Sequence, residues 1–337
     1  MPRKARLEFE GAVYHVMDRG DRLEAIFLDD EDRRLFLKTL WQACERTGWR
    51  VHSYVLMGNH YHLLMETPEA NLSSGMRWLQ ATYTIRHNVR HRLRGHLFQG
   101  RYKAILVDPQ SETYFRTVSD YIHLNPARAA LLEPGKKLSD FPWSSFPALI
   151  GTPRKRPAGL AAERVVCGWG DSDNVRGRKR YREALEKRAK DEQRASTIDE
   201  GMLKSLRRGW CFGSEEFRQG LLEKFDSFSA DAGTSDKKIR RHDEAEAERL
   251  IRTGMECLGL DDLGGQPKGS SVKIALAAFV KSRTVVTNLW ITRRLQMGDP
   301  RRASRYCAEA GSREDVRKIS KRLEKAGSKT RFSRSTA

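Results

Sequence analysis

Two histidines separated by one residue are the first side chains in this sequence that could do chemistry. His60 and His62 follow a Gly-Asn dipeptide, which is typical of a turn, and the residues after them favour a strand. Because strand side chains alternate, both imidazoles lie on one face of that strand. Two imidazoles in this arrangement can bind one divalent metal and leave positions for other ligands. The alternative is a pair of partly buried histidines that only form hydrogen bonds.

The elements that would position these histidines follow a simple order. Hydrophobic periodicity and turn residues predict, in order, a strand at 12–17, a helix at 30–47, a strand at 50–57, the strand that begins at His60, a helix from 71 to 95 and a strand at 96–107. This order predicts an α+β, ferredoxin-like (RRM-like) fold, with an antiparallel sheet and helices on one face.

A further helix carries a second group that could react. Apolar residues at helical spacing predict a helix from 111 to 125, and Pro126 is expected to end it. Tyr121 and Asn125 are four residues apart and therefore share one face of this helix. Alternatively, the tyrosine is an ordinary packing residue and the asparagine only terminates the helix.

Positive charge is abundant in the whole sequence. The 337 residues carry a formal net charge of +19, which favours a polyanionic partner, nucleic acid before an acidic membrane surface. Near the candidate groups, cations alternate with aromatic residues, as in grooves that bind a single nucleic-acid strand. A solvated helix face is the alternative. These cations are Arg86, Arg90, Arg92, Arg94, Arg101 and Lys103.

Other sequence features bear on the compartment. No segment reaches the roughly 20 apolar residues of a membrane span, and no apolar signal-peptide core follows the basic N-terminus. The five cysteines are scattered and include no Cys-x-x-Cys pair, which argues against a disulfide framework. We therefore expect a reduced, cytoplasmic protein associated with the nucleoid and not with a membrane.

Three stretches taken together resemble a known family. They are Gly58-Asn59-His60-Tyr61-His62, then Gly95-His96-Leu97-Phe98-Gln99-Gly100-Arg101-Tyr102-Lys103, then Tyr121-Ile122-His123-Leu124-Asn125-Pro126. In this order, and on this series of elements, they resemble the REP-associated tyrosine transposases of the HUH superfamily, which are similar to the insertion-sequence single-tyrosine transposases. The resemblance covers about residues 7–150.

The resemblance implies roles for individual residues. It places the nucleophile at Tyr121, the metal-binding pair at His60 and His62, and a third metal ligand at Asn125. Gln99 lies in the stretch expected to contact DNA. The implied metal is magnesium or manganese, although the ligand types alone do not exclude zinc. The implied substrate is single-stranded DNA that forms hairpins from short palindromic repeats.

The chemistry implied for Tyr121 accounts for the metal. A tyrosine has an unperturbed pKa of about 10, so its phenolate is scarce at neutral pH. A divalent metal on the scissile phosphate neutralises oxygen charge and orients the group for attack. Attack by the tyrosine would leave a 5′-phosphotyrosine and a free 3′ hydroxyl, and the strand could then be rejoined without ATP.

The sequence after the catalytic helix divides by composition. We expect a transposase domain at 1–150, a basic helical linker region at 151–240, a helical domain at 241–311 and a basic, partly disordered tail at 312–337.

The helical domain contains a second candidate DNA-binding element. A short helix, a turn at Gly298 and a basic helix within 271–311 predict a helix-turn-helix that binds duplex DNA. This pattern resembles appendages of some longer members of the transposase group, and a plain helical bundle is the alternative. The basic residues of the last helix are Arg301, Arg302 and Arg305.

The favoured hypothesis is a metal-dependent single-strand DNA endonuclease or transposase that cleaves and rejoins hairpin-forming DNA. One alternative is a DNA-binding regulator that keeps a degenerate nuclease fold and uses the helix-turn-helix. Another is a metal hydrolase that uses His60 and His62 with water and needs no tyrosine. The sequence leaves a monomer and a dimer equally open.

Overall fold

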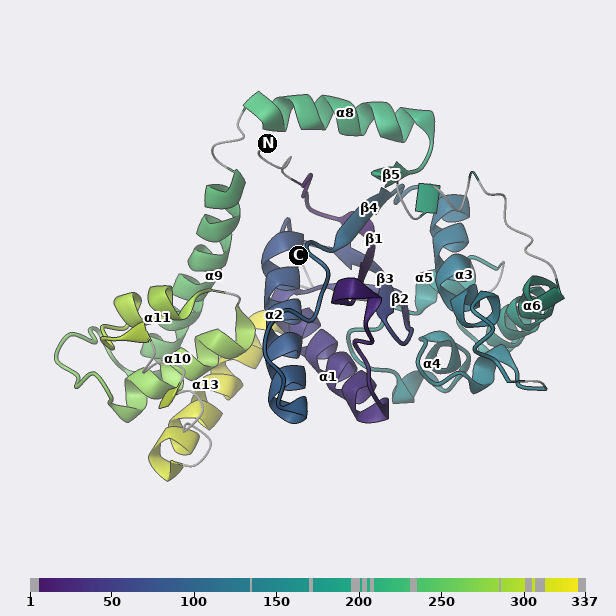
Figure 1. Cartoon of the computed structure of the whole chain (residues 1–337). Coiled ribbons are helices and arrows are strands. Elements are labelled where there is room, and N and C mark those ends of the chain that lie inside the picture. Colours follow the sequence, from purple (N-terminus) through teal and green to yellow (C-terminus); the bar gives the residue numbers. More distant parts are fainter. Residues whose placement is uncertain are drawn as a thin grey trace. The chain divides into compact units, whose positions relative to one another are not determined.

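The computed structural model contains two compact units, Met1–Ala230 and Asp231–Ala337, which we describe separately. The described residues are 6–133, 135–169, 172–194, 201, 205–206, 209–230, 235–284, 286–300, 305–306 and 313–332. Figure 1 labels their helices and strands. No helix in the described part of the chain is both long enough and apolar enough to cross a membrane.

The first unit is built on a five-stranded mixed sheet in the order β2-β3-β1-β4-β5. The strands are β1 (Ala12–Arg19), β2 (Arg50–Leu56), β3 (His60–Thr67), β4 (Lys103–Val107) and β5 (Cys211–Phe212). The first four strands pair antiparallel with their neighbours, whereas β5 pairs parallel with β4. An antiparallel sheet was predicted, and this prediction is wrong for β5, which makes the sheet mixed. A two-residue strand is too short to show an alternating pattern, which explains why the sequence did not reveal β5.

Helices cover both faces of this sheet (Figure 1). On one face, α1 (Asp30–Thr47) and α2 (Leu72–His91) pack together, and Phe36 of α1 lies 4.8 Å from the ring of Tyr61. On the other face, α3 (Glu112–Arg128) packs against β2 and β3, with Ser119 Oγ 2.6 Å from Ser53 Oγ. The one-face prediction concerned the helices of the four-strand unit, and α1 and α2 do lie on one face. Helix α3 follows that unit and covers the opposite face.

The segment before β4 is irregular where a longer strand was predicted. The strand begins at Lys103 and not at 96, because two glycines with positive φ interrupt the extended backbone, Gly95 at +102° and Gly100 at +68°. Between them, Phe98 forms only an isolated bridge with Gly20. The irregular segment brings the predicted DNA-contact stretch to the end of β1.

Helix α3 continues beyond the proline that was expected to end it. Pro126 lies inside the helix, which extends to Arg128. The last turn is completed by hydrogen bonds from Ala129 N–H to Asn125 O (2.9 Å) and from Leu131 N–H to Pro126 O (2.9 Å). Proline lacks only one N–H donor. Because Pro126 lies two residues before the end of the helix, the loss of this donor does not prevent the last turn from forming.

The region expected to be a basic linker contributes to the core of the first unit. Helix α6 (Val175–Arg194) buries Tyr181, Leu185 and Ala189, which are spaced four residues apart. Its many charged residues hide this narrow apolar stripe in the sequence. The same region contains η3 (Pro153–Lys155), α5 (Glu163–Cys167) and α8 (Glu215–Ala230). Before it lie η1 (Asp21–Leu23), which follows β1, and η2 (Leu138–Asp140) and α4 (Phe146–Ile150), which follow α3.

The second unit is helical. It comprises α9 (Ser235–Leu258), α10 (Ser271–Arg283), α11 (Asn288–Arg294) and α13 (Glu314–Phe332). Helix α13 occupies most of the predicted disordered tail and buries Val316 and Leu323 in the same core as Leu276 and Ile291. A basic, partly disordered tail was predicted, whereas residues 314–332 form a helix, whose regular apolar spacing is hard to recognise in the sequence among so many basic residues.

Candidate active site

The β2–β3 hairpin presents both predicted histidines on the face of the sheet that α3 covers. The N–H of Met57 donates to His60 O (2.9 Å), which closes the two-residue turn. His60 is half-buried and His62 is 5% exposed, and their ring centroids are 5.2 Å apart. The hairpin therefore brings the two imidazoles together, as the alternation of strand side chains predicts.

A neighbouring asparagine fixes the protonation of His60. The amide nitrogen of Asn59 donates to Leu23 O (3.0 Å), so its amide oxygen faces Nδ1 of His60 at 2.8 Å. This oxygen can only accept, so Nδ1 carries the proton. The neutral ring then has its lone pair on Nε2, which is the form that binds a metal.

A third histidine, which sequence reasoning missed, lies against His62. His15 of β1 is fully buried, and its Nε2 is 2.9 Å from Nδ1 of His62. The two rings stack at 5.1 Å. Burial lowers the pKa of His15 to about 3, so the ring is neutral at physiological pH. A polar residue inside the apolar 12–17 strand was the sequence signal that could have revealed it.

Tyr121 of α3 faces this histidine cluster. Its ring lies edge-on to His62 at 5.7 Å and to His15 at 5.8 Å. The contact of Ser119 with Ser53, and the packing of Phe115 edge-on to His52 at 4.9 Å, hold α3 over β2. The structure thus brings the predicted nucleophile to the predicted metal-binding pair. Tyr121 is only 2% exposed.

The carbonyl of Tyr121 receives two side-chain donors from its own helix. They are Nδ2 of Asn125 at 2.9 Å and Nη1 of Arg128 at 3.2 Å. The Asn125 amide therefore bends back toward the residue one turn earlier. Arg128, which the sequence did not single out, also lies 5.1 Å from the centre of the Tyr121 ring and donates two hydrogen bonds to the carboxylate of Glu192 in α6.

The predicted DNA-binding cations separate into two groups. Lys103 is exposed and lies opposite Met17 of β1, which in turn lies opposite His62, so these side chains share the histidine face. In the same way, the exposed Arg19 lies opposite His60. Its Nε donates to Gln99 Oε1 at 3.0 Å, which brings this predicted residue near the site.

Two other cations, Arg86 and Arg90, lie on α2, on the opposite face of the sheet. Arg86 donates to Thr39 of α1 (2.7 Å), and Arg90 forms ion pairs with Asp29 (2.6 Å) and Asp32 (2.7 Å). The structure does not bring these two to Tyr121. Arg92, Arg94 and Arg101 are exposed, as is Arg305 in the second unit, whereas Arg301 and Arg302 lie outside the described residues.

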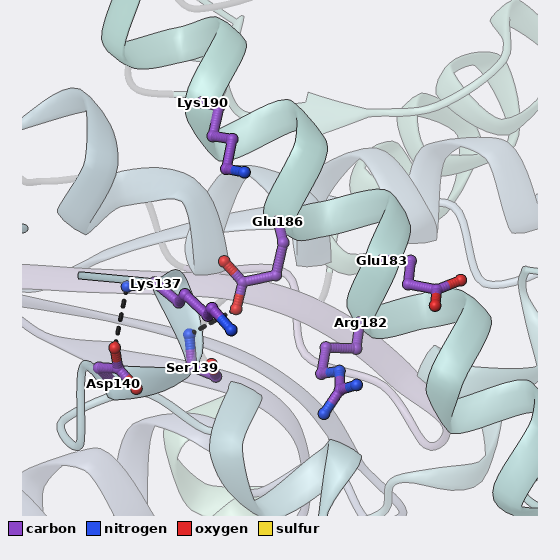
Figure 2. Close-up of a pocket in the computed structure, with 7 residues that line it drawn as sticks. All are labelled: Lys137, Ser139, Asp140, Arg182, Glu183, Glu186 and Lys190. Atoms are coloured by element: carbon purple, nitrogen blue, oxygen red, sulfur yellow. Dashed lines mark hydrogen bonds between the residues drawn. The ribbon is translucent and has the colours of Figure 1, made fainter. Parts of the chain in front are cut away.

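A cavity of about 310 Å³ lies elsewhere, between η2 and α6 (Figure 2). Two of its carboxylates already have internal partners. The carboxylate of Glu186 accepts hydrogen bonds from the N–H groups of Leu138 (2.8 Å) and Ser139 (2.9 Å), and Asp140 accepts one from Lys137 N–H (2.9 Å). None of the predicted site residues lines this cavity, whose polar groups serve to cap η2.

Comparison with known proteins supports the motif-based resemblance for the first part of the chain. Residues 9–125 match the family model described as "Transposase IS200 like". This match contains His60, His62 and Tyr121 and ends at Asn125. This part of the chain is therefore similar to the IS200-like transposases, as the three motifs predicted.

One solved structure and the curated proteins complete the comparison. The structure is described as that of a REP-associated tyrosine transposase bound to a REP hairpin. Its sequence is 18% identical to this chain, and the TM-score is 0.38. The match covers 44% of this chain and 86% of the chain in that structure. No curated protein matches the chain.

Proposed function

We propose that this protein is a metal-dependent, single-tyrosine DNA endonuclease and strand transferase that acts on single-stranded, hairpin-forming DNA. The observation that carries this proposal is the position of the Tyr121 ring beside His62, 5.7 Å away, in the segment that is similar to IS200-like transposases. A general role in DNA processing agrees with that similarity and with the net charge of +19.

The donor atoms suit a catalytic divalent metal. His60 offers Nε2, because Asn59 occupies its Nδ1, and His62 offers Nε2 when its own Nδ1 donates to His15. Two imidazoles and the amide oxygen of Asn125 would hold the ion and leave positions for phosphate oxygens. Manganese accepts imidazole more readily than magnesium does, so we propose manganese or magnesium in that order. When bound, the ion would neutralise charge on the scissile phosphate.

The phenol of Tyr121 would act as the nucleophile. Its oxygen would form a bond to the phosphorus while the phenolic proton passes to water, and the bond to the 3′ oxygen would break as that oxygen takes up a proton from water. The products are a 5′-phosphotyrosine and a free 3′ hydroxyl, and the reverse attack by a 3′ hydroxyl rejoins a strand. Lys103, Arg19 and Gln99 lie on or beside the same face and would bind the backbone of the strand.

His15 would position His62 for this reaction. One of the two rings must donate in the contact of 2.9 Å, and only donation by His62 Nδ1 leaves the lone pair of His62 on Nε2. A buried, neutral His15 can accept this hydrogen bond at any working pH. Partners of this kind orient a metal ligand and fix its tautomer.

The burial of Tyr121 favours a second candidate function. Its ring is 2% exposed, with Arg128 lying over it, so DNA can reach the phenol only after covering side chains move. A DNA-binding regulator would need no such movement. The two functions differ in whether the protein ever becomes attached to DNA.

One experiment separates these functions and the water-using hydrolase. The full-length protein is incubated with end-labelled single-stranded hairpin DNA and manganese, and the products are resolved on a denaturing gel. We expect a protein–DNA adduct on the 5′ side of the cut. Two free ends without an adduct would indicate a water nucleophile, and uncut DNA bound by the protein would indicate the regulator.

We also propose finer assignments for the two units. The order β2-β3-β1-β4, antiparallel throughout, would correspond to the ferredoxin-like arrangement. In the second unit, α11, the turn at Gly298 (φ +85°) and the basic residues after it would form a helix-turn-helix. A chain that ends at Ala230 should still cleave a short hairpin but bind longer DNA with lower affinity and a smaller salt dependence. Equal affinities and salt slopes for the two chains would indicate a plain bundle.

A further inference from the structure

A second cluster of metal-binding side chains lies between α1 and α2, on the face of the sheet away from Tyr121. Asp32 stands in the first turn of α1, and His87 and His91 are one turn apart near the end of α2. One ligand atom from each of the three residues lies within 4.8 Å of the other two. Asp32 and His87 are 0% and 1% exposed.

The protons of this cluster do not fit its hydrogen bonds. Nε2 of His91 is 2.9 Å from both carboxylate oxygens of Asp32 and 2.8 Å from Nη1 of Arg90. If Nε2 carries a proton, it faces the guanidinium donor. If it does not, its lone pair faces two anionic oxygens. A cation bound to Nε2 and the carboxylate removes the second conflict, and it would compete with the Arg90 guanidinium for the Asp32 oxygens.

His87 supplies an independent indication of a ligand. Neither of its ring nitrogens makes a hydrogen bond of normal geometry within the described part of the chain, and Nε2 lies 3.7 Å from Oδ2 of Asp32. A buried polar group without such a bond is costly. A metal bound to Nε2 would give this nitrogen the partner that the described part of the chain does not provide.

We propose that Asp32, His87 and His91 bind a zinc ion that fastens the beginning of α1 to the end of α2. Two imidazole nitrogens and one carboxylate oxygen are typical zinc ligands, and a water would complete the tetrahedron. Ligand atoms at tetrahedral zinc are roughly 3.4 Å apart. The distances of 2.9 and 3.7 Å from the carboxylate to the two histidines bracket that value.

This site is separate from the candidate active site. The ring of His87 packs on Tyr83 (5.9 Å), Tyr83 packs on Phe36 (5.1 Å) and Phe36 packs on Tyr61 (4.8 Å). Tyr61 lies on the face of β3 opposite the two active-site histidines. An aromatic layer and the sheet thus lie between the two groups, so the zinc proposal does not depend on the proposed function.

Zinc titration of the full-length protein tests this inference. The His60→Ala/His62→Ala double variant removes the other candidate site and serves as the background, and zinc binding is followed by competition with a chromophoric chelator. We expect one zinc ion per chain in the background. Adding His91→Gln, which can still donate to Asp32, should weaken this binding at least about 100-fold, and His87→Gln should act in the same way.

Thermal unfolding gives a second measurement. Saturating zinc should raise the Tm of the background by about 5 °C, and this rise should disappear in both triple variants. Melting without zinc shows whether each triple variant is folded. An absence of zinc binding in the background would overturn the proposal, as would equal affinity in the background and in both folded triple variants.

Discussion

On one face of the sheet, His60 and His62 lie two residues apart on a strand beside Tyr121, whereas on the other face His87 and His91 lie four residues apart on a helix beside Asp32. The first group combines neutral imidazoles with a phenol and has exposed cations, Lys103 and Arg19, at its edge. The second combines imidazoles with a buried carboxylate that already attracts a guanidinium.

This difference separates two uses of the same side chain. A neutral ligand set binds a metal weakly and leaves it to be held jointly with an anionic substrate, as a phosphate-cleaving site requires. A carboxylate that replaces solvent between two helices suits an ion that stays bound. The spacing of the histidines follows the element, because side chains repeat every two residues on a strand and every three to four on a helix.

The largest expected effect comes from removing the phenol. Tyr121→Phe deletes one hydroxyl and keeps the ring packing against His62, so the protein should fold while the covalent DNA adduct disappears. The measurement is a denaturing gel with labelled hairpin DNA and manganese. Tyr114→Phe is the matched control, because this half-buried tyrosine of α3 packs on Phe212 and not on the histidines. An adduct that persists in Tyr121→Phe would show that another residue is the nucleophile.

Removing the strand histidines should have the next largest effect. His60→Ala/His62→Ala deletes both imidazole ligands, and we expect cleavage to fall at least about 100-fold. Binding of single-stranded DNA should survive, because phosphate contacts to cations supply most of the affinity. Cleavage rate and binding affinity are measured on the same preparation, with Tm as the control for folding. Unchanged cleavage would eliminate the metal site on this face.

The substitution His15→Phe should have a smaller effect on the same face. Phenylalanine keeps an aromatic ring on His62 but removes the acceptor for its Nδ1. The manganese concentration for half-maximal cleavage should rise about 10–100-fold, while the rate at saturating manganese changes little. A lower rate at every manganese concentration, without a shift in this midpoint, would indicate only a packing role for His15.

Local patterns in the sequence located the elements of the candidate active site, whereas the other face depends on distant partners. Alternation on a strand and spacing on a helix are local, so the elements that carry His60, His62 and Tyr121 could be placed, while the role of Tyr121 came from the family resemblance. His15 is brought to them only by pairing of β1 with β3, and the pairing partner of a strand is not a local property. His87 and His91 are at helical spacing, but their carboxylate partner lies 55 residues before His87, in another helix.

The basic residues show why charge alone was misleading. Arg86 and Arg90 of α2 look like Arg92, just after this helix, when only the sequence is considered. Only the packing of α2 on α1 shows that the first two bind Thr39 and Asp32. Strand β5 was missed because it is only two residues long and pairs with β4, a distant strand. The apolar stripe of α6 was missed because many charged residues of the same helix surround it in the sequence.

Acid titration probes the carboxylate of the second face. Burial alone would raise the pKa of Asp32, but hydrogen bonds from His91 and Leu28 N–H lower it overall. A lowered pKa in the folded state adds stability above the unfolded pKa of about 3.9, and this contribution is lost as pH falls through the folded value. Asp32→Asn should therefore reduce the unfolding free energy by about 1–2 kcal/mol at pH 7.

The difference in unfolding free energy between wild type and Asp32→Asn should begin to shrink below about pH 4, where Asp32 becomes protonated in the unfolded chain, and should continue to shrink as pH falls through the lower pKa of the folded state. Urea unfolding at a series of pH values, without zinc, measures this difference. Asp30→Asn is the control, because this exposed residue lies in the same helical turn and pairs only with Arg33 among the ion pairs of the described chain. A difference that stays constant with pH would show that the charge of Asp32 does not stabilise the fold.

The smallest expected effect comes from the guanidinium that competes for the same carboxylate. Arg90 pairs with both Asp29 and Asp32, so Arg90→Gln should lower the Tm of the zinc-free protein slightly. The same change removes a cation from the oxygens that zinc would bind, so zinc affinity should rise on the order of tenfold. The two effects have opposite signs, which a general loss of packing cannot produce. Competition titration and thermal unfolding of the same variant measure them, with Arg94→Gln, an exposed position after α2, as the control. A fall in both zinc affinity and Tm would show that Arg90 supports the cluster and does not compete with a metal.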